Sequence, residues 1–263
     1  MGAVIGGAFA CGVDLAKLER VLKTLDLNKL LGIPDNTFKG VEGLVGRTAS
    51  EYLFKKADWR SVEPAPTQKL FEFFYLFAGD KEFKDLKIQF ATVAADIDTG
   101  EEVILKEGKV YQAIAASVAV PGIHYPVKLN KRFLVDGGII NKVPVDVAVE
   151  LGADIVIAVD VSTPLSNKVT TSLDTLIQAS AVTAQALTRL KLEQIQQKLG
   201  DRLLILRPPI DSVRMLHLKQ LDLPIKAGEQ EAERYIEQIK ALISADAKAL
   251  SAATAAAATS ASE

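Results

Sequence analysis

The chain has 263 residues, 31 lysines and arginines against 33 aspartates and glutamates, and a formal net charge of -2. This length and the 49% hydrophobic content are typical of a globular protein and allow one large domain or two small ones. The near-neutral charge argues against a nucleic-acid partner, because a domain that binds nucleic acid is expected to be clearly basic.

Cysteine and histidine are too few for a zinc cage or an internal disulfide. Cys11 is the single cysteine, and the two histidines are His124 and His217. A tetrahedral Cys/His zinc site needs more ligands than these residues supply. We therefore predict no cofactor, no metal site, and a reducing, cytoplasmic location.

The apolar stretches are too short to span a membrane. The run from 69 to 79 is interrupted by Glu72, and a spanning helix needs about 20 predominantly apolar residues. The uncharged first twelve residues are not preceded by the basic region of a secretory signal. The sequence thus predicts no transmembrane segment.

Residues 1–12 are predicted to form a helix with a face of small side chains. Gly2, Gly6 and Ala10 recur at helical spacing, which favours close packing on a sheet. A helix normally begins after a capping residue, whereas this one begins at Met1. We expect a segment to precede it.

Helices are also predicted over 14–25, 48–56 and 67–78, with a loop over 32–46. The third of these helices is rich in aromatic residues. Core packing is the favoured interpretation of these aromatics, because aromatic stripes are usually buried, and a lipid-contacting flap is the alternative.

The next part of the chain changes to a strand period. A strand over 86–97, a turn over 98–100 and a strand over 101–106 predict a hairpin, and a helix is expected over 109–119. A second hairpin is predicted over 127–135, with its turn at Asn130 and Lys131.

The remaining elements favour a layered α/β fold. A helix over 145–151 leads to the continuous apolar run 153–162, which is typical of a parallel strand buried on both faces. A long helix begins at Ser172, a short strand covers 202–209, and an amphipathic helix covers 228–243. Strands that alternate with helices indicate a mostly parallel sheet. The Ala/Ser-rich segment 244–263 is expected to be a disordered or weakly helical tail.

Asp136-Gly137-Gly138 is the most informative short motif. It follows an apolar strand, and ligands bind at the carboxyl ends of strands in open α/β sheets. The glycines permit a positive φ or a close approach of backbone or substrate to the carboxylate. A solvated turn is the alternative, because Asp-Gly is ordinary turn chemistry.

The surrounding segment 90–146 resembles the patatin-like phospholipase family. Three features occur in the family's order: a Thr99-Gly100 turn, the run Ala-Ser-x-Ala-x-Pro-Gly over 116–122, and the Asp136 motif, which continues through Asn141 and Pro144 to Asp146. The resemblance extends to about residue 235. It implies a three-layer α/β/α fold with a mostly parallel central sheet that lacks its N-terminal strand or strands in this chain.

The opening of the chain resembles the helix that follows the family's nucleophile elbow, G-x-S-x-G. On that alignment Met1 and Gly2 are the remnant of the elbow, its last two positions, and the nucleophilic serine would be the residue directly before Met1. The family's glycine-rich oxyanion loop also finds no counterpart among the 263 residues.

The resemblance implies a lipid acyl hydrolase or esterase with a Ser-Asp dyad. Asp136 would accept the serine proton while the serine attacks an ester carbonyl, and Gly137 and Gly138 would support the aspartate. Without the serine, the chain as given is expected to be inactive. Two alternatives are a catalytically dead binding or regulatory module of the same fold and an unrelated α/β enzyme that uses Asp136 differently.

Ser117 and His124 are weaker candidates for catalysis. Ser117 has no elbow around it, so packing at a helix end is favoured. His124 is interpreted as a partly buried structural residue rather than a member of a triad. The expected domain is 1–243, its expected partner is a lipid or other ester substrate, and transient contact with a membrane surface is possible.

Overall fold

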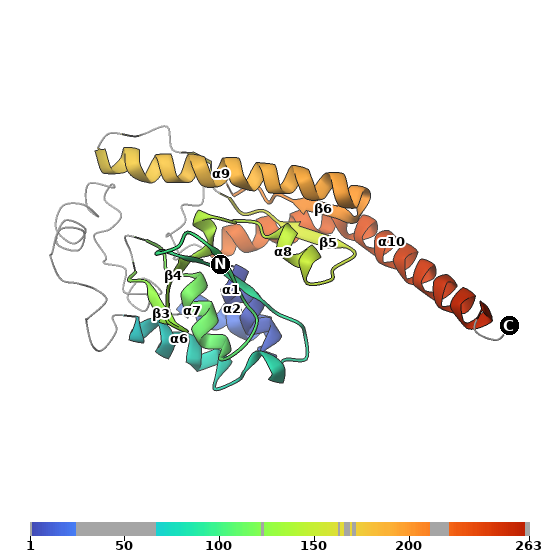
Figure 1. Cartoon of the computed structure of the whole chain (residues 1–263), viewed down its shortest axis with the longest axis horizontal. Helices are drawn as coiled ribbons and strands as arrows, with labels where there is room; N and C mark the ends of the chain where they lie inside the picture. Colours follow the sequence, from blue (N-terminus) through green and yellow to red (C-terminus); the bar gives the residue numbers. More distant parts are fainter. Residues whose placement is uncertain are drawn as a thin grey trace. The chain divides into compact units, whose positions relative to one another are not determined.

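The computed structural model describes residues 2–24, 67–121, 124–162, 164–165, 169, 172–210 and 221–260 (Figure 1). The chain divides into two units: the first has residues 1–142, 164–188 and 216–219, and the second has residues 143–163, 189–215 and 220–263. The expected loop 32–46 and helix 48–56 lie outside the described residues, as do Met1 and His217.

The first unit is built on a four-stranded sheet with the strand order β2-β1-β4-β3. Its strands are β1 (Thr92–Asp96), β2 (Glu102–Leu105), β3 (Val127–Leu129) and β4 (Arg132–Asp136). All three pairs of neighbouring strands are antiparallel. Every residue of the central strand β1 is buried.

Two tight turns build this sheet, and both predicted hairpins are confirmed. β1 returns as β2 through a turn in which Gly100 has a φ of 73°. β3 returns as β4 through Asn130 and Lys131, whose φ angles are 49° and 67°. Two successive residues in the left-handed region are what a two-residue hairpin of this twist requires.

The mixed α/β class is confirmed, but the prediction of a mostly parallel sheet is wrong for the described strands. Each tight turn reverses the chain, so the strands that it joins must be antiparallel. β4 also lies antiparallel to β1, with Ala94 opposite Asp136. Among the described residues, parallel pairing occurs between β5 and β6.

The first unit also contains the helices α1 (Gly2–Ala10), α2 (Leu15–Thr24), α6 (Gln68–Ala78) and α7 (Val110–Ser117). α7 packs on β1, β3 and β4, and α6 packs on α7 (Figure 1). The 3-10 turn η2 (Phe83–Asp85) precedes β1, and Phe83 stacks on Phe90 with 5.8 Å between ring centroids.

The small-residue face of α1 packs differently from the prediction. Gly2 is exposed, and the tightest contact is made by Gly7, where a Cβ atom would lie 2.4 Å from Cδ1 of Ile114 on α7. α1 also contacts α6. Gly7 therefore allows a close approach between α1 and α7. This contact is not made by the expected face of Gly2, Gly6 and Ala10.

The favoured interpretation of the α6 aromatics is confirmed for Phe73 and Phe74, which belong to the core, whereas Tyr75 is 48% exposed. Phe74 is fully buried and Phe73 is 7% exposed. Their rings pack with a centroid distance of 5.0 Å, and Phe77 meets both edge-on. Leu76, in the same helix, is 77% exposed.

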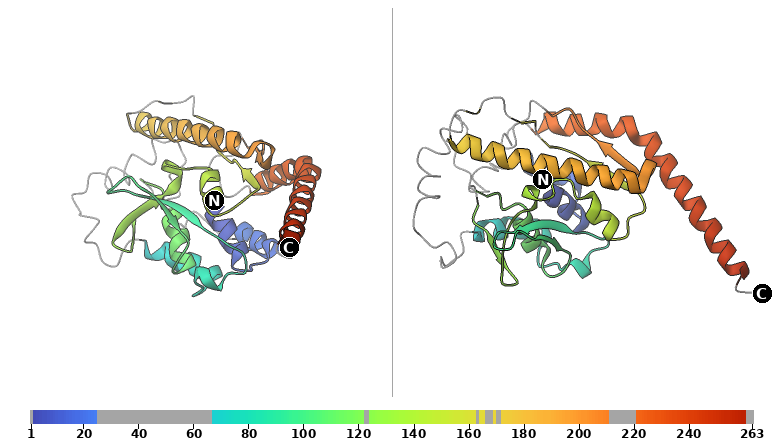
Figure 2. Two further views of the ribbon diagram at one scale, coloured as in Figure 1. Left: turned by 45° about the vertical axis from the view of Figure 1, so that its right-hand side comes forward. Right: turned by 45° about the horizontal axis from the view of Figure 1, so that its top comes forward.

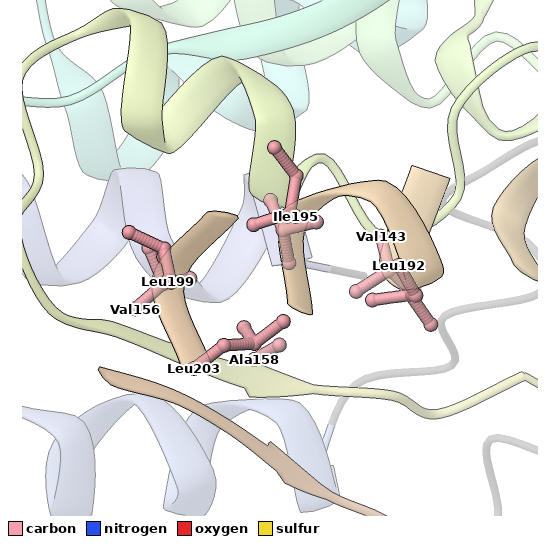
Figure 3. Packing of buried hydrophobic residues seen from close by; sticks show 8 residues of the cluster. Val143, Val156, Ala158, Leu192, Ile195, Leu199 and Leu203 are labelled. Atoms are coloured by element: carbon pink, nitrogen blue, oxygen red, sulfur yellow. The ribbon is translucent and has the colours of Figure 1, made fainter. Parts of the chain in front are cut away.

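The second unit contains the parallel pair β5 (Val156–Val159) and β6 (Leu203–Leu206) with α8 (Val145–Glu150), the 3-10 turn η4 (Gly200–Arg202) and the part of α9 (Ser172–Leu199) after residue 188. Buried apolar side chains from these elements form one cluster (Figure 3). Its members are Val143, Val145, Val156, Ala158, Leu192, Ile195, Leu199 and Leu203.

The strand β5 is buried on one face only, which corrects the prediction of burial on both. Val156 and Ala158 are buried in the cluster, whereas Ile157 and Val159 are 41% and 54% exposed. Because side chains alternate along a strand, these two exposed residues share the other face. A continuous apolar run does not by itself show that both faces are covered.

The last helix is longer than predicted. α10 runs from Asp222 to Ser260 rather than over 228–243, and it continues as helix almost to the C-terminus (Figure 2). Pro224 lies in its first turn, where proline is tolerated, and alanine, the strongest helix former, dominates its end. No helix in the described residues is long and apolar enough to cross a membrane.

Candidate active site

Asp136 is the last residue of β4 and lies where this strand leaves the sheet. It stands opposite Ala94 of β1, and its main-chain N–H donates to the carbonyl oxygen of Ala119 at 2.9 Å. Ala119 follows α7, in the Ala-Ser-x-Ala-x-Pro-Gly segment that the sequence singled out. Two parts of the motif, separated along the chain, therefore meet at the aspartate.

The carboxylate of Asp136 is held by the turn that follows it. Oδ1 accepts a hydrogen bond from the main-chain N–H of Gly138 at 2.7 Å, so that Asp136 caps the short 3-10 turn η3 (Gly137–Ile139). Asp136 is partly buried and Gly137 is buried. A freely solvated turn does not fit these observations.

Close approach, not a positive φ, is the reason for the two glycines. Neither is among the glycines with positive φ. A Cβ atom on Gly137 would lie 2.3 Å from the carbonyl oxygen of Val93, and one on Gly138 would lie 3.0 Å from Oδ1 of Asp136. Gly137 thus allows the chain to pass β1, and Gly138 allows the backbone to reach the carboxylate.

Asn141 closes the turn after Asp136. The sequence motif includes this residue, but the motif did not predict a role for it. Its main-chain N–H donates to the carbonyl oxygen of Gly137 at 2.8 Å. Its side-chain Nδ2 donates to Oε1 of Glu102 at 2.7 Å, and the residue is 3% exposed. The polar amide close to the buried end of the strand is the sequence signal that could have predicted this role, because buried polar groups are normally hydrogen-bonded.

Burial raises the pKa of the Asp136 carboxyl above its ordinary value, because a charged carboxylate is poorly solvated there. The hydrogen bond from Gly138 opposes this rise, as do the positive charges of the amino terminus, His124 and Lys142. The net effect is a raised pKa. Such a carboxylate is a stronger proton acceptor than an exposed aspartate, which suits general-base chemistry.

The other candidates lie in different settings. Ser117 is the last residue of α7 and is partly buried. His124 is partly buried, its main-chain N–H donates to Val120, and its charge lowers the pKa of Asp136. Gly2 begins α1, and Met1 lies outside the described residues. Across the part of the chain that the structure describes, no cluster of acidic, histidine or cysteine side chains could hold a metal.

Residues 1–149 match the patatin-like phospholipase family. This match covers more than half of the chain and includes the Asp136 motif, so the chain belongs to that family. An uncharacterised NTE family protein of Mycobacterium tuberculosis is 27% identical over 187 residues, which cover 61% of this chain and 31% of the relative.

Mammalian relatives match a longer part of the chain. Patatin-like phospholipase domain-containing protein 7 of Mus musculus is 29% identical over 267 aligned residues, which cover 86% of this chain and 20% of the mouse protein. The corresponding protein of Rattus norvegicus is 25% identical over the same shares. The chain therefore spans between a fifth and a third of the length of these relatives.

Proposed function

We propose that this chain carries the proton-accepting half of a lipid acyl hydrolase of the phospholipase A type. The observation that carries the proposal is the carboxylate of Asp136, which is partly buried at a strand end, held by the Gly138 N–H at 2.7 Å, and raised in pKa by burial. Membership of the patatin-like phospholipase family supports a lipid ester as the substrate.

In the proposed chemistry the serine proton moves first to Asp136 and then to the leaving group. A serine Oγ attacks the ester carbonyl while its proton passes to Asp136, and the protonated carboxyl then gives this proton to the departing alkoxide. A water molecule, activated in the same way, releases the acyl group from the serine. Within the described residues, Oδ1 is occupied by the bond from Gly138, so Oδ2 is the oxygen proposed to accept.

The serine of this proposal is the residue that the family motif places directly before Met1. The oxyanion donors are assigned by the same resemblance to the segment that precedes the serine.

The test uses the chain extended at its amino end by the residues encoded upstream, if these contain an in-frame G-x-S. The extended protein should hydrolyse a p-nitrophenyl ester and phospholipid vesicles, and a serine-directed phosphonate should label it only while that serine is present. Asp136→Asn should reduce kcat by about a thousandfold or more and leave the fold intact, because it removes the base.

A matched control is Asp154→Asn, which changes an exposed aspartate and should leave kcat unchanged. Unchanged hydrolysis in Asp136→Asn would remove Asp136 from the mechanism. Vesicle binding without hydrolysis or labelling in the extended wild-type protein would instead support the binding-module alternative.

A further inference from the structure

Asn141 and Glu102 form a contact between the turn after Asp136 and the far strand of the sheet. Glu102 is the first residue of β2, and Asn141 follows Asp136 by five positions. The amide Nδ2 donates to Oε1 of the carboxylate at 2.7 Å.

This contact closes a ring of interactions around the site. Asp136 pairs with Ala94 of β1, and Glu102 pairs with the next residue, Ala95. The bond from Asn141 to Glu102 joins the turn back to β2, and its main-chain N–H returns to the carbonyl oxygen of Gly137. The turn is therefore fixed to the sheet at both its ends.

The N–H that holds the carboxylate lies inside this ring. Gly138 is between the two fixed points, and its donation to Oδ1 at 2.7 Å depends on where the turn is held. If the far anchor were released, Gly137 would still be confined by Val93, but the residues after it would lose this hydrogen bond to β2. The Gly138 hydrogen bond would then open more often.

We propose that Asn141 is a positioning residue: through its hydrogen bond to Glu102 it holds the Gly138 N–H on the Asp136 carboxylate and so orients that carboxylate. The geometric part of this inference stands on the contacts alone, and its catalytic consequence rests on the function proposed above. We expect Glu102 to act through Asn141, because its carboxylate accepts a hydrogen bond from the Asn141 amide.

Four variants of the 263-residue chain separate the effect of the Asn141–Glu102 hydrogen bond from the effect of the Glu102 charge. Asn141→Leu removes the donor, and Glu102→Val removes the acceptor on a strand where valine is favoured. Glu102→Gln keeps an acceptor oxygen and removes the charge. Glu101→Gln is the matched control, because Glu101 is the neighbouring acid and pairs with Arg132 at 2.6 Å instead of Asn141.

Two NMR measurements read out the site in each folded variant. Hydrogen exchange of the Gly138 amide should become about tenfold faster in Asn141→Leu and Glu102→Val, as expected for the loss of one typical hydrogen bond. The pKa of Asp136, followed by its carboxyl carbon, should rise, because a weaker bond to Gly138 stabilises the charged form less. Glu102→Gln and Glu101→Gln should resemble the wild type in both measurements.

A Gly138 exchange rate and an Asp136 titration that stay at wild-type values in Glu102→Val would overturn the proposal, as would equal changes in Glu101→Gln. Glu102→Val decides the matter if Asn141→Leu does not fold, since it alters a partly exposed residue. In the extended enzyme, kcat should fall in Glu102→Val with KM unchanged, and Glu102→Gln should restore it. NMR changes together with full activity of Asp136→Asn would contradict the proposed function but not the positioning role.

Discussion

The main-chain N–H of Asp136 donates to the carbonyl oxygen of Ala119 at 2.9 Å, and this bond joins the end of β4 to the segment that follows α7. Ala119 is fully buried, so the bond is shielded from water. It leaves the Asp136 side chain at the strand end, where Gly138 meets it. The position of the carboxylate is thus set by a helix, a strand and a turn together.

The raised pKa of Asp136 predicts how stability depends on pH. The protonated form is favoured in the folded state, so the resulting stabilisation is fully present below the unfolded pKa, near 3.8, and is lost as the pH rises through the higher folded pKa. Asp136→Asn does not titrate, and its amide oxygen can still accept from Gly138. The free energy of unfolding of the wild type should therefore fall relative to the variant across this window.

Urea titrations of both proteins from pH 3 to pH 7 measure this difference. A gap between the two proteins that stays constant over the window would show that folding does not change the pKa of Asp136, and a gap that moves in the opposite direction would show that folding lowers it.

Lys142 should tune the same carboxyl. Its positive charge lowers the pKa of Asp136, so Lys142→Met should raise that pKa, because the charged form loses a favourable interaction. Carbon NMR of the Asp136 carboxyl measures the change. Lys128→Met is the control, since Lys128 lies over the ring of Phe133 at 5.9 Å and is not among the charges that act on Asp136. Equal shifts in the two variants would contradict the assignment.

Gly137 should tolerate no side chain. A Cβ atom there would lie 2.3 Å from the main-chain oxygen of Val93, and a backbone atom in a sheet cannot move aside cheaply. We expect Gly137→Ala to lower the free energy of unfolding by about 1–3 kcal/mol, as overpacking typically does. Gly2→Ala, which meets no atom within 4 Å, should change it by no more than about 1 kcal/mol. Chemical unfolding curves compare them, and equal stabilities would show that β1 does not confine Gly137.

Two residues of α6 test the assignment of its aromatics to the core. Phe74 is fully buried, so Phe74→Ala should cost about 3–5 kcal/mol of unfolding free energy. Leu76 is 77% exposed, so Leu76→Ala should change stability by about 0.5 kcal/mol or less. Thermal melts give both values. Similar small effects at the two positions, with reduced vesicle binding in Phe74→Ala, would favour the lipid-contacting flap.

Local features were predictable from the sequence because they depend on neighbouring residues. The two hairpins follow from turn residues, as at Asn130 and Lys131, and the burial of Phe73 and Phe74 follows from aromatic patterning. The order of the motifs around Asp136 was sufficient to indicate the family, which the match over residues 1–149 establishes. These properties require no knowledge of which distant segments meet.

Only the tertiary structure decided how those segments combine. The antiparallel pairing of β1 with β4, the packing of Gly7 on Ile114, and the exposed face of β5 all depend on partners far along the chain, which hydrophobic periodicity does not specify. The same holds for the bond between Asn141 and Glu102, whose residues are 39 positions apart. The sequence by itself indicated the residues that we propose to carry the chemistry, and the folded sheet decided which residues contact them.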